Sequence, residues 1–406
     1  MHPTQDGRYA PQAESCVHCG LCMSACPSTA PKPPALEEPL GVFHETLIGF
    51  STTGEERLRS SSGGLATRVL KALLSNGQVD AVVAATATGD RHPPAHPLFR
   101  ASVLRSTEDV DCATGSKYYP LEFSSPLQEL RSSGETFALV GLPCVITALR
   151  RGQEHFQWLR NQCKHLIGLT CGHLVTTHYT TFLSAVSGVA PEDVVSVDYR
   201  RKPGPTGAGD FKFVATGDDG TTGEELPFSS GGGIPVILWG TKLFTPPACF
   251  RCSDLFAVDA DLTLMDAWLP EYREERDGTS LAVVRSEAIR ELLEDEQRAG
   301  RVHLEAIEPD RVIQSQAGAL ASRRVNAALL QSESGGPRMP FRMAVQSRYE
   351  RMRSELSNRL MAGGPGQRNL GMTVIRAWLR GHRALRRLRS LAARVFRGIA
   401  ALWRTA

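Results

Sequence analysis

The chain has 406 residues, of which 41% are hydrophobic and 22% are charged, a composition typical of globular proteins. No apolar run reaches the roughly 20 residues of a membrane-spanning helix, and residues 1–15 lack the apolar centre of a signal peptide. We therefore expect a cytoplasmic protein, in which the ten cysteines are metal or redox ligands rather than disulfide partners.

The charge is distributed unevenly along the chain. The formal net charge is +3, yet ten arginines and no acidic residue lie between Arg368 and the last residue, so the rest of the chain is net acidic. An acidic body argues against nucleic-acid binding, and the basic tail contains no recognised RNA-binding module. We expect no nucleic-acid partner.

The first predicted unit, residues 1–35, carries four cysteines and ends in a proline cluster. Cys16, Cys19, Cys22 and Cys26 follow the ferredoxin-type pattern C-x2-C-x2-C-x3-C-P, in which closely spaced thiolates wrap a [4Fe–4S] cluster. Cys26 either completes this cluster or serves another site. A zinc knuckle is the alternative, although zinc sites rarely space three cysteines in this way.

The second predicted unit, residues 36–190, has an α/β pattern. A Ser-Ser-Gly-Gly turn precedes a helix whose apolar stripe runs from Leu65 to Leu74. Short apolar runs predict three buried strands, at 81–85, 137–140 and 166–170.

The third predicted unit, residues 191–330, is richer in strand signals. Its strand candidates are 194–199, 212–215, 260–265 and 281–285, followed by a charged helix near 286–299. The last unit, residues 331–406, shows helical patterns near 340–361 and 372–404. We expect no compact core after residue 330.

Four further cysteines are candidate ligands. Cys144 and Cys171 each follow the carboxyl end of a predicted strand, the edge at which ligands gather in an open α/β sheet. Cys249 and Cys252 form a C-x2-C pair, which fits half of a zinc site as well as an iron–sulfur site. Together the four could supply a second four-thiolate site, whereas Cys112 and Cys163 lack such a setting.

Two polar segments are candidates for a flavin site. The turn formed by Ser61, Ser62, Gly63 and Gly64 opens a helix, whose free N–H groups suit an anion such as a phosphate. Further along, Lys117 could offset pyrophosphate charge and Tyr118 could stack on a flavin ring. The alternative is an ordinary capped turn and a surface Lys-Tyr pair.

These motifs belong to a series that keeps its order over residues 40–300. The series comprises Ser61-Ser62-Gly63-Gly64, Thr114-Gly115-Ser116-Lys117-Tyr118, Gly141-Leu142-Pro143-Cys144, Cys171-Gly172, Cys249 to Asp254, Ala260 to Thr263, Asp266-Ala267-Trp268 and Gly278-Thr279-Ser280-Leu281. As a series it resembles the beta subunits of coenzyme F420-reducing hydrogenases and dehydrogenases. Relatives of that family include ferredoxin-dependent vinyl reductases and 7-hydroxymethyl chlorophyll a reductase.

The resemblance implies a set of cofactors and partners. It implies a flavin, FAD rather than FMN, held by Ser61, Ser62, Gly63, Gly64, Thr114, Ser116, Lys117 and Tyr118. It also implies a [4Fe–4S] cluster on Cys144, Cys171, Cys249 and Cys252, and ferredoxin or coenzyme F420 as the redox partner. Tyr119-Pro120-Leu121, Arg200-Arg201-Lys202 and Ala267-Trp268 depart from the family's usual motifs, which bears on the electron donor or acceptor.

Our hypothesis is an iron–sulfur flavoprotein oxidoreductase with FAD and two [4Fe–4S] clusters on an α/β core. The alternatives are a non-catalytic electron-transfer subunit of a larger complex and a zinc-stabilised binding protein. His173 is the nearest candidate for a proton donor, and a hydrogen-bonding or core histidine is its alternative role.

The tail, residues 368–406, has the pattern of a basic amphipathic helix. Trp378, Leu385, Ala392 and Ile399 recur every seven residues, and arginines occupy many of the positions between them. Such a helix docks on an anionic membrane surface, here the inner face of the membrane, or on an acidic partner. Equally, it packs on its own acidic body or on a second copy.

Overall fold

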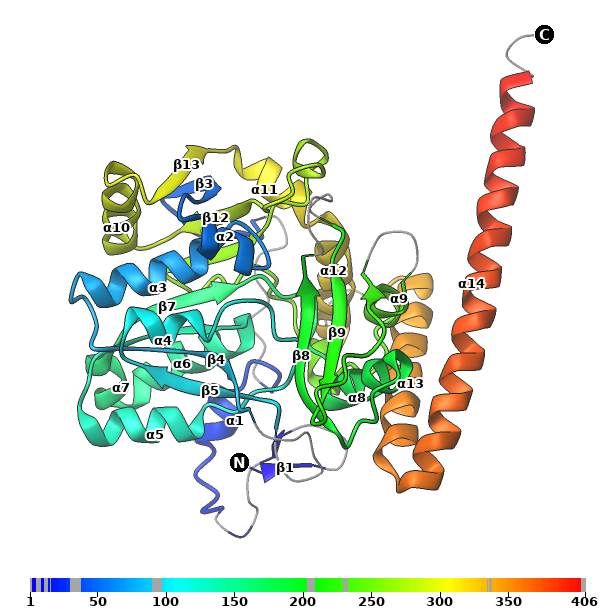
Figure 1. The fold of residues 1–406 in the computed structure, drawn as a ribbon, viewed down its shortest axis with the longest axis horizontal. Coiled ribbons are helices and arrows are strands. Elements are labelled where there is room, and N and C mark those ends of the chain that lie inside the picture. The colour runs from blue at the N-terminus through cyan, green and yellow to red at the C-terminus, as the bar shows by residue number, and fades with distance from the viewer. Residues whose placement is uncertain are drawn as a thin grey trace.

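The computed structural model describes residues 2–4, 9–10, 14, 16–29, 38–89, 97–202, 209–228, 233–333, 335 and 338–402. Its centre is an eight-stranded sheet in the order β13-β3-β12-β11-β7-β6-β4-β5 (Figure 1). In that order the strands span Val302–Ala306, Glu45–Ser51, Ser280–Val284, Leu262–Asp266, Cys163–Leu169, Phe137–Gly141, Ala81–Ala87 and Phe99–Leu104. The pairs from β11 to β4 are parallel and the outer pairs antiparallel, which confirms a mixed α/β fold.

Helices cover both faces of this sheet. Side chains alternate along β4, so that Val82 and Ala84 pack with α3 (Leu65–Ser75) and α10 (Glu287–Arg298). Ala81 and Val83 face the opposite layer. That layer consists of α5 (Ser124–Ser133), α6 (Pro143–His155) and α7 (Gln157–Gln162). Because both faces are buried, the central strands read as continuous apolar runs.

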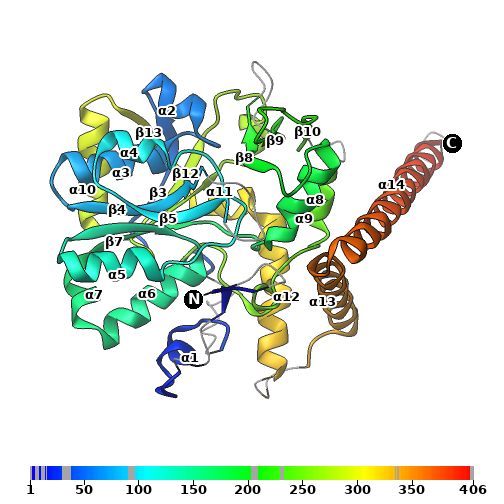
Figure 2. The ribbon, with the colours of Figure 1, turned by 60° about the horizontal axis from the view of Figure 1, so that its bottom comes forward.

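A smaller sheet lies beside the large one (Figures 1 and 2). Its strands, in the order β10-β9-β8, span Leu226–Pro227, Lys212–Gly217 and Val194–Arg201. The core around it includes Phe182 of α8 (Thr177–Ser187) and Leu238 of α9 (Ile234–Gly240), together with Tyr199 and Phe213.

The helices after residue 310 differ from the sequence-based prediction, because part of them is buried in a core. The chain continues through α12 (Ala317–Glu333), α13 (Phe341–Ala362) and α14 (Pro365–Leu402). Met361, Met372, Ile375 and Leu379 are buried in the core of the smaller sheet, so the prediction of no core after residue 330 was wrong. Met372, Ile375 and Leu379 attach the first half of α14 to the body, and the second half of the helix projects away from it (Figures 1 and 2).

All seven predicted strands are present, as β4, β6, β7, β8, β9, β11 and β12. The sequence did not reveal β3, β5 and β13, which are outer strands of the large sheet. In β13 only Val302 and Leu304 are buried, and in β5 the buried positions are interrupted by Arg100, so neither shows a continuous apolar run.

The remaining elements are short. They are β1 (His2–Pro3), β2 (Tyr9–Ala10), α1 (Leu21–Ala25), α2 (Gly54–Arg59), α4 (Thr107–Asp111), η2 (Pro247–Arg251), η3 (Pro270–Tyr272) and α11 (Pro309–Ser315). Among the residues described, no helix combines the length and apolar character needed to cross a membrane.

Candidate functional site

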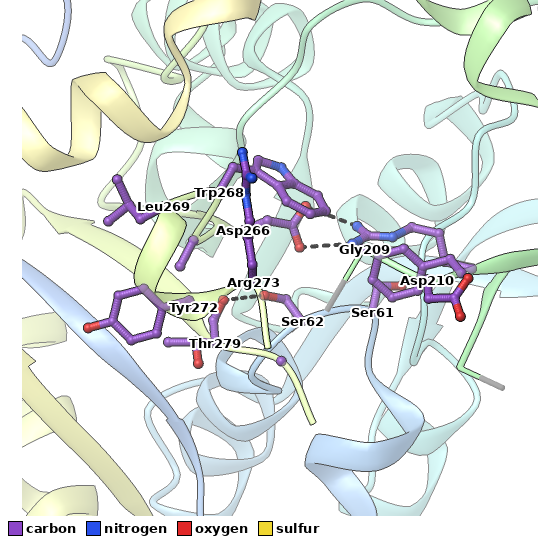
Figure 3. Close-up of a pocket in the computed structure, with 14 residues that line it drawn as sticks. Ser61, Ser62, Gly209, Asp210, Asp266, Trp268, Leu269, Tyr272, Arg273 and Thr279 are labelled. Atoms are coloured by element: carbon purple, nitrogen blue, oxygen red, sulfur yellow. Dashed lines mark hydrogen bonds and ion pairs between the residues drawn. The ribbon is translucent and has the colours of Figure 1, made fainter. Parts of the chain in front are cut away.

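A cavity of about 480 Å³ opens beside the carboxyl end of β11, where the large sheet meets the smaller one (Figure 3). Its walls come from segments that are far apart in the chain. These are the turn at 61–62, Arg200 at the end of β8, residues 209–211, residues 266–269, residues 272–273 and the turn at 278–279.

The cavity lining combines aromatic rings with positive charge. Phe211, Trp268 and Tyr272 contribute rings, and Arg200 and Arg273 contribute guanidinium groups. Rings stack on flat ligands, and guanidinium groups bind phosphate oxygens in pairs. The carboxylates of Asp210 and Asp266 also line the cavity, and Asp266 pairs with Arg200. The lining therefore suits a planar ligand, with Arg273 as the group that can bind a phosphate.

An ion pair fixes one wall of the cavity. Arg200 is buried, and its Nη1 and Nη2 atoms donate to Oδ2 and Oδ1 of Asp266 at 3.0 and 3.1 Å. The guanidinium carbon lies 4.0 Å from the ring centre of Phe211 and 5.5 Å from that of Trp268. Burial lowers the pKa of Arg200, but the carboxylate of Asp266 outweighs it and the net shift is upward. Arg200 remains charged and orients both rings.

The turns at 61–62 and 278–279 are held together by hydrogen bonds and close packing. The Ser62 hydroxyl donates to the carbonyl oxygen of Thr279 at 2.7 Å, a bond visible in Figure 3. Gly278 has a φ of +87°, and a Cβ there would lie 2.8 Å from the Ser62 carbonyl. The Lys202 ammonium adds a bridge by donating to the carbonyl oxygens of Ser62 and Asp277 at 3.3 and 2.6 Å.

The turn at 61–64 divides into two parts. Ser61 and Ser62 line the cavity, as a ligand-binding role requires. A Cβ on Gly63 would lie 2.7 Å from the Gly49 carbonyl oxygen of β3, so close packing on the sheet requires glycine. Gly64 has a φ of +83° and caps α3. The two glycines thus have a structural explanation within the fold.

The segment 114–118 lies behind the turn rather than in the cavity wall. The backbone N–H of Ser116 donates to the Ser61 hydroxyl at 2.8 Å. The Lys117 ammonium donates to the carbonyl oxygens of residues 113, 114 and 115, and burial lowers its pKa to about 8. Tyr118 packs on Trp239, with ring centres 4.7 Å apart. The buried Thr114 hydroxyl has no hydrogen-bond partner within the described structure.

Cys144, Cys171, Cys249 and Cys252 form a second feature, which we call the inner cysteine group. Burial raises the pKa of the thiols of Cys144 to about 12 and of Cys249 to about 11, and it also raises those of Cys171 and Cys252. Charges on neighbouring thiols of the group raise the pKa values of Cys144, Cys171 and Cys249 further, and the Asp254 carboxylate raises that of Cys252. The Arg323 guanidinium lowers all four pKa values. The structure thus brings these four side chains together.

The inner cysteine group lies at the edge of the sheet where the carboxyl ends of β6 and β7 meet, as the sequence predicts. β6 and β7 are parallel neighbours, so Cys144 and Cys171 leave adjacent strands at the same edge. Cys249 lies in η2, and its sulfur accepts the backbone N–H of Leu174 at 3.4 Å. Helix α12 covers η2, and Arg323 and Asn326 of that helix donate to cysteine carbonyls.

The N-terminal cysteines lie outside this core. Cys16, Cys19 and Cys22 are exposed and Cys26 is half-buried, around the single turn of α1. The segment 16–29 packs on α6, which begins at the residue before Cys144.

Two arginines hold this segment in place. Arg151 of α6 donates to the carbonyl oxygens of Ser24 and Cys26 at 3.2 and 3.4 Å. Arg251, within the C-x2-C pair, donates to that of Ser28 at 3.4 Å. The two elements α6 and η2, which both carry inner cysteines, thus contact the N-terminal segment.

His173 lies beside the inner cysteine group. It is buried, its ring centre is 4.2 Å from that of Trp239, and its Nε2 atom has no hydrogen-bond partner in the described structure. Burial lowers its pKa to about 3, so the ring is neutral at physiological pH. These surroundings are those of a core histidine, one of the two roles considered from the sequence.

No three His, Cys, Asp or Glu side chains converge closely enough to hold a single metal ion in the part of the chain that the structure describes. A four-iron cubane is larger than one ion, so its ligands stand farther apart. For such a cluster the donor set is the relevant test, and four thiols beside a buried guanidinium fit a negatively charged iron–sulfur group.

Comparisons with known proteins decide the family. Two profiles match, both described as "Coenzyme F420 hydrogenase/dehydrogenase, beta subunit". The profile of its N-terminal part matches residues 46–128, and the profile of its C-terminal part matches residues 134–310. Together the matches cover more than half of the chain. The chain belongs to this family.

Individual members of the family resemble the chain at lower identity. The chain is 23% identical over 280 residues to one of the subunits of the F(420)H(2) dehydrogenase of Methanosarcina mazei, which is 67% of either protein. A chain of the xenon-derivatised F420-reducing [NiFe] hydrogenase complex from Methanosarcina barkeri shares the fold, with a TM-score of 0.54 and 18% identity. That likeness covers 76% of this chain and 99% of the other.

As a member of this family, the chain is an oxidoreductase component. The family profiles include the cavity and the inner cysteine group, but not residues 16–29 or the helices after residue 310. From the sequence, Arg200, Trp268 and Thr279 were recognised as members of motifs but were not predicted to line a cavity. It missed Phe211 and Arg273, which stand in no recognisable pattern.

Proposed function

We propose that this chain is an iron–sulfur flavoprotein that passes electrons between a substrate and either a deazaflavin of the coenzyme F420 type or a ferredoxin. The observation that carries the proposal is the inner cysteine group, because four thiols from three separate parts of the chain meet beside one buried guanidinium. A purely structural core has no need of four such thiols and a buried charge.

The proposal gives each cysteine set its own [4Fe–4S] cluster. Cys144, Cys171, Cys249 and Cys252 would hold the inner one, and the set from Cys16 to Cys26 would hold the outer one within the unit 1–35. The contacts of Arg151 and Arg251 with residues 24–28 support a relay, because they hold the outer segment against two elements that carry inner cysteines. When bound, the clusters supply one-electron transfer and the flavin two-electron transfer.

The flavin would occupy the cavity beside β11, and FAD suits its lining better than FMN does because the cavity offers several rings beside the guanidinium of Arg273. In this arrangement Ser61 and Ser62 present polar groups, Arg273 binds phosphate, Arg200 holds Asp266 in place, and Trp268 packs on a ring. Thr114, Ser116, Lys117 and Tyr118 support the serine turn from behind. In the proposed division, residues 36–190 and 191–330 form the two halves of this site.

A non-catalytic role within a larger complex is the second candidate. It is favoured by the two relatives, one of which belongs to a dehydrogenase of several subunits and the other to a hydrogenase complex. Co-purification with a larger catalytic subunit, together with loss of substrate turnover when that subunit is removed, would support it.

Anaerobic purification followed by iron, sulfide and flavin analysis tests the proposal. We expect about eight iron and eight sulfide per chain, with one flavin. About four iron without flavin would reduce the chain to a one-cluster electron carrier. Zinc alone would overturn the redox proposal in favour of a zinc-stabilised binding protein.

We also propose that the hairpin of α13 and α14 docks on an anionic membrane surface. Seven large apolar side chains on it are exposed, namely Phe341, Val345, Tyr349, Met352, Leu356, Leu370 and Val374. Residues 338–402 contain fifteen arginines and two glutamates, which complements anionic lipid at about 1 kcal/mol per arginine near the surface.

Vesicle sedimentation tests this docking. Because residues up to Leu379 belong to the core, the informative truncation ends the chain after Ala384 and removes only the projecting half of α14. We expect the full chain to sediment with vesicles that contain phosphatidylserine and not with pure phosphatidylcholine, and the truncated chain to bind more weakly. A full chain that ignores the anionic vesicles would contradict the proposal.

A further inference from the structure

Arg323 is the largest fully buried side chain among the described residues, with 1% of its surface exposed. It lies on α12, outside the residues that match the family profiles, and no motif in the sequence marks it. Burying a guanidinium costs several kcal/mol unless hydrogen bonds and negative charge compensate for the lost water.

The hydrogen bonds of Arg323 all end on the backbone of the inner cysteine group. Its Nη1 atom donates to the carbonyl oxygens of Cys249 and Cys252 at 3.3 and 2.9 Å. Its Nη2 atom donates to that of Cys171 at 2.6 Å. Three of the four cysteines are thus held by one planar fork, which a point charge such as an ammonium reproduces less well.

Asn326, one turn further along α12, duplicates part of this arrangement without a charge. Its Nδ2 atom donates to the carbonyl oxygens of Cys249 and Cys252 at 2.9 and 2.7 Å. The same helix therefore presents a charged and a neutral donor to the same two carbonyls, which provides a natural control.

The charge of Arg323 is not neutralised by its hydrogen bonds, because these end on neutral carbonyls. The groups that compensate it most strongly are the sulfurs of Cys252, Cys171 and Cys249, and the Asp254 carboxylate acts on it more weakly than they do. In return, the guanidinium lowers the pKa of all four thiols of the group. When four thiolates bind an iron–sulfide core their charge outweighs that of the core, and each added electron makes the site more negative.

We infer that Arg323 is the counter-charge and the positioning residue of the inner four-cysteine site. It orders the backbone of three ligands and makes the inner cluster easier to reduce than it would be without the guanidinium. This inference rests on the proposed function, because it concerns the cluster proposed for that site. This role of Arg323 would explain why α12, which lies outside the family profiles, covers η2.

Potentiometric titration followed by electron paramagnetic resonance tests this inference on the anaerobically purified full chain. Arg323→Gln removes the charge, Arg323→Lys retains it, and Asn326→Ala removes two hydrogen bonds to the same carbonyls. We expect the inner signal to move to a lower potential in Arg323→Gln, to stay closer to the parent in Arg323→Lys, and to shift least in Asn326→Ala. Equal shifts in Arg323→Gln and Asn326→Ala would overturn the counter-charge role.

Iron analysis covers the case in which a variant does not assemble the inner cluster. Loss of about four iron in Arg323→Gln but not in Arg323→Lys supports the inference, because the lysine variant keeps a positive charge at this position and the glutamine variant does not. Loss in both variants contradicts the counter-charge role, because Arg323→Lys keeps the charge. A parent protein whose iron content is unchanged by Cys144→Ser would instead refute the four-cysteine assignment, which separates failure of the proposed function from failure of this inference.

Discussion

The two cysteine sets of this protein are built in opposite ways. The inner group combines Cys144 and Cys171 from adjacent strand ends with a C-x2-C pair from η2, which α12 covers. Cys171 is buried, Cys249 and Cys252 are half-buried, and Cys144 is exposed. The N-terminal set is a single run from Cys16 to Cys26 with three exposed residues, attached by a few arginine contacts. The inner group is part of the fold, whereas the outer set is an appendage.

The largest expected effect comes from removing one ligand from each set. Cys171→Ser and Cys19→Ser should each lose about four iron per chain, but only Cys171→Ser should unfold more easily, by about 2 kcal/mol or more. The reason is that the Cys171 side chain is buried, so that a serine hydroxyl there loses its water, whereas Cys19 is exposed.

Iron analysis and urea unfolding of both variants measure this difference. The parent chain, purified in parallel, is the control. Equal losses of stability in the two variants would show that the N-terminal set is as integral to the fold as the inner group is.

An intermediate effect is expected from removing all iron. In the apo chain, amide exchange in residues 16–29 should approach that of an unfolded peptide, because α1 is a single turn with exposed cysteines. Residues 247–252 should exchange more slowly, since Arg323 and Asn326 still hold the carbonyls of Cys249 and Cys252. Hydrogen exchange with mass spectrometry compares the two segments, with β7 as the internal reference. Equal exchange in both would contradict the idea that α12 preorganises the inner group.

The smallest effect is expected from the contacts between the two regions. Arg151→Ala and Arg251→Ala each remove hydrogen bonds to residues 24–28, worth about 0.5–1.5 kcal/mol per bond. Iron content should stay unchanged, while limited proteolysis ahead of residue 38 should quicken several-fold. Arg160→Ala is the matched control, because Arg160 donates only to carbonyls of Gln153 and Glu154. Faster cleavage in the control as well would mean that the effect is general destabilisation.

Much of the cysteine arrangement could be predicted because strand ends carry positional information. Apolar runs identified β6 and β7, and parallel neighbours place Cys144 and Cys171 at one edge. The spacing of the N-terminal run is local and can be read directly from the chain.

The residues that support these cysteines could not be predicted in the same way. Arg323 and Asn326 sit on a helix whose pattern shows only that one face is buried, not what that face covers. Similarly, the apolar stripe of α14 is the same whether it packs on the body or elsewhere, so the sequence left both alternatives open and did not single out Ile375 and Leu379. Phe211 reaches the cavity only because the two sheets meet there.

The cavity beside β11 has a consequence for the lifetime of the protein. Its walls join the turn at 61–62, Arg200, residues 209–211 and residues between 266 and 279, which an unfolded chain holds far apart. A ligand that binds only the assembled cavity stabilises the folded chain by about 2.7 kcal/mol at a hundredfold excess over its dissociation constant. If a cofactor occupies the cavity, chains that lack it would unfold more often and be degraded sooner, so the supply of that cofactor would influence the abundance of the protein.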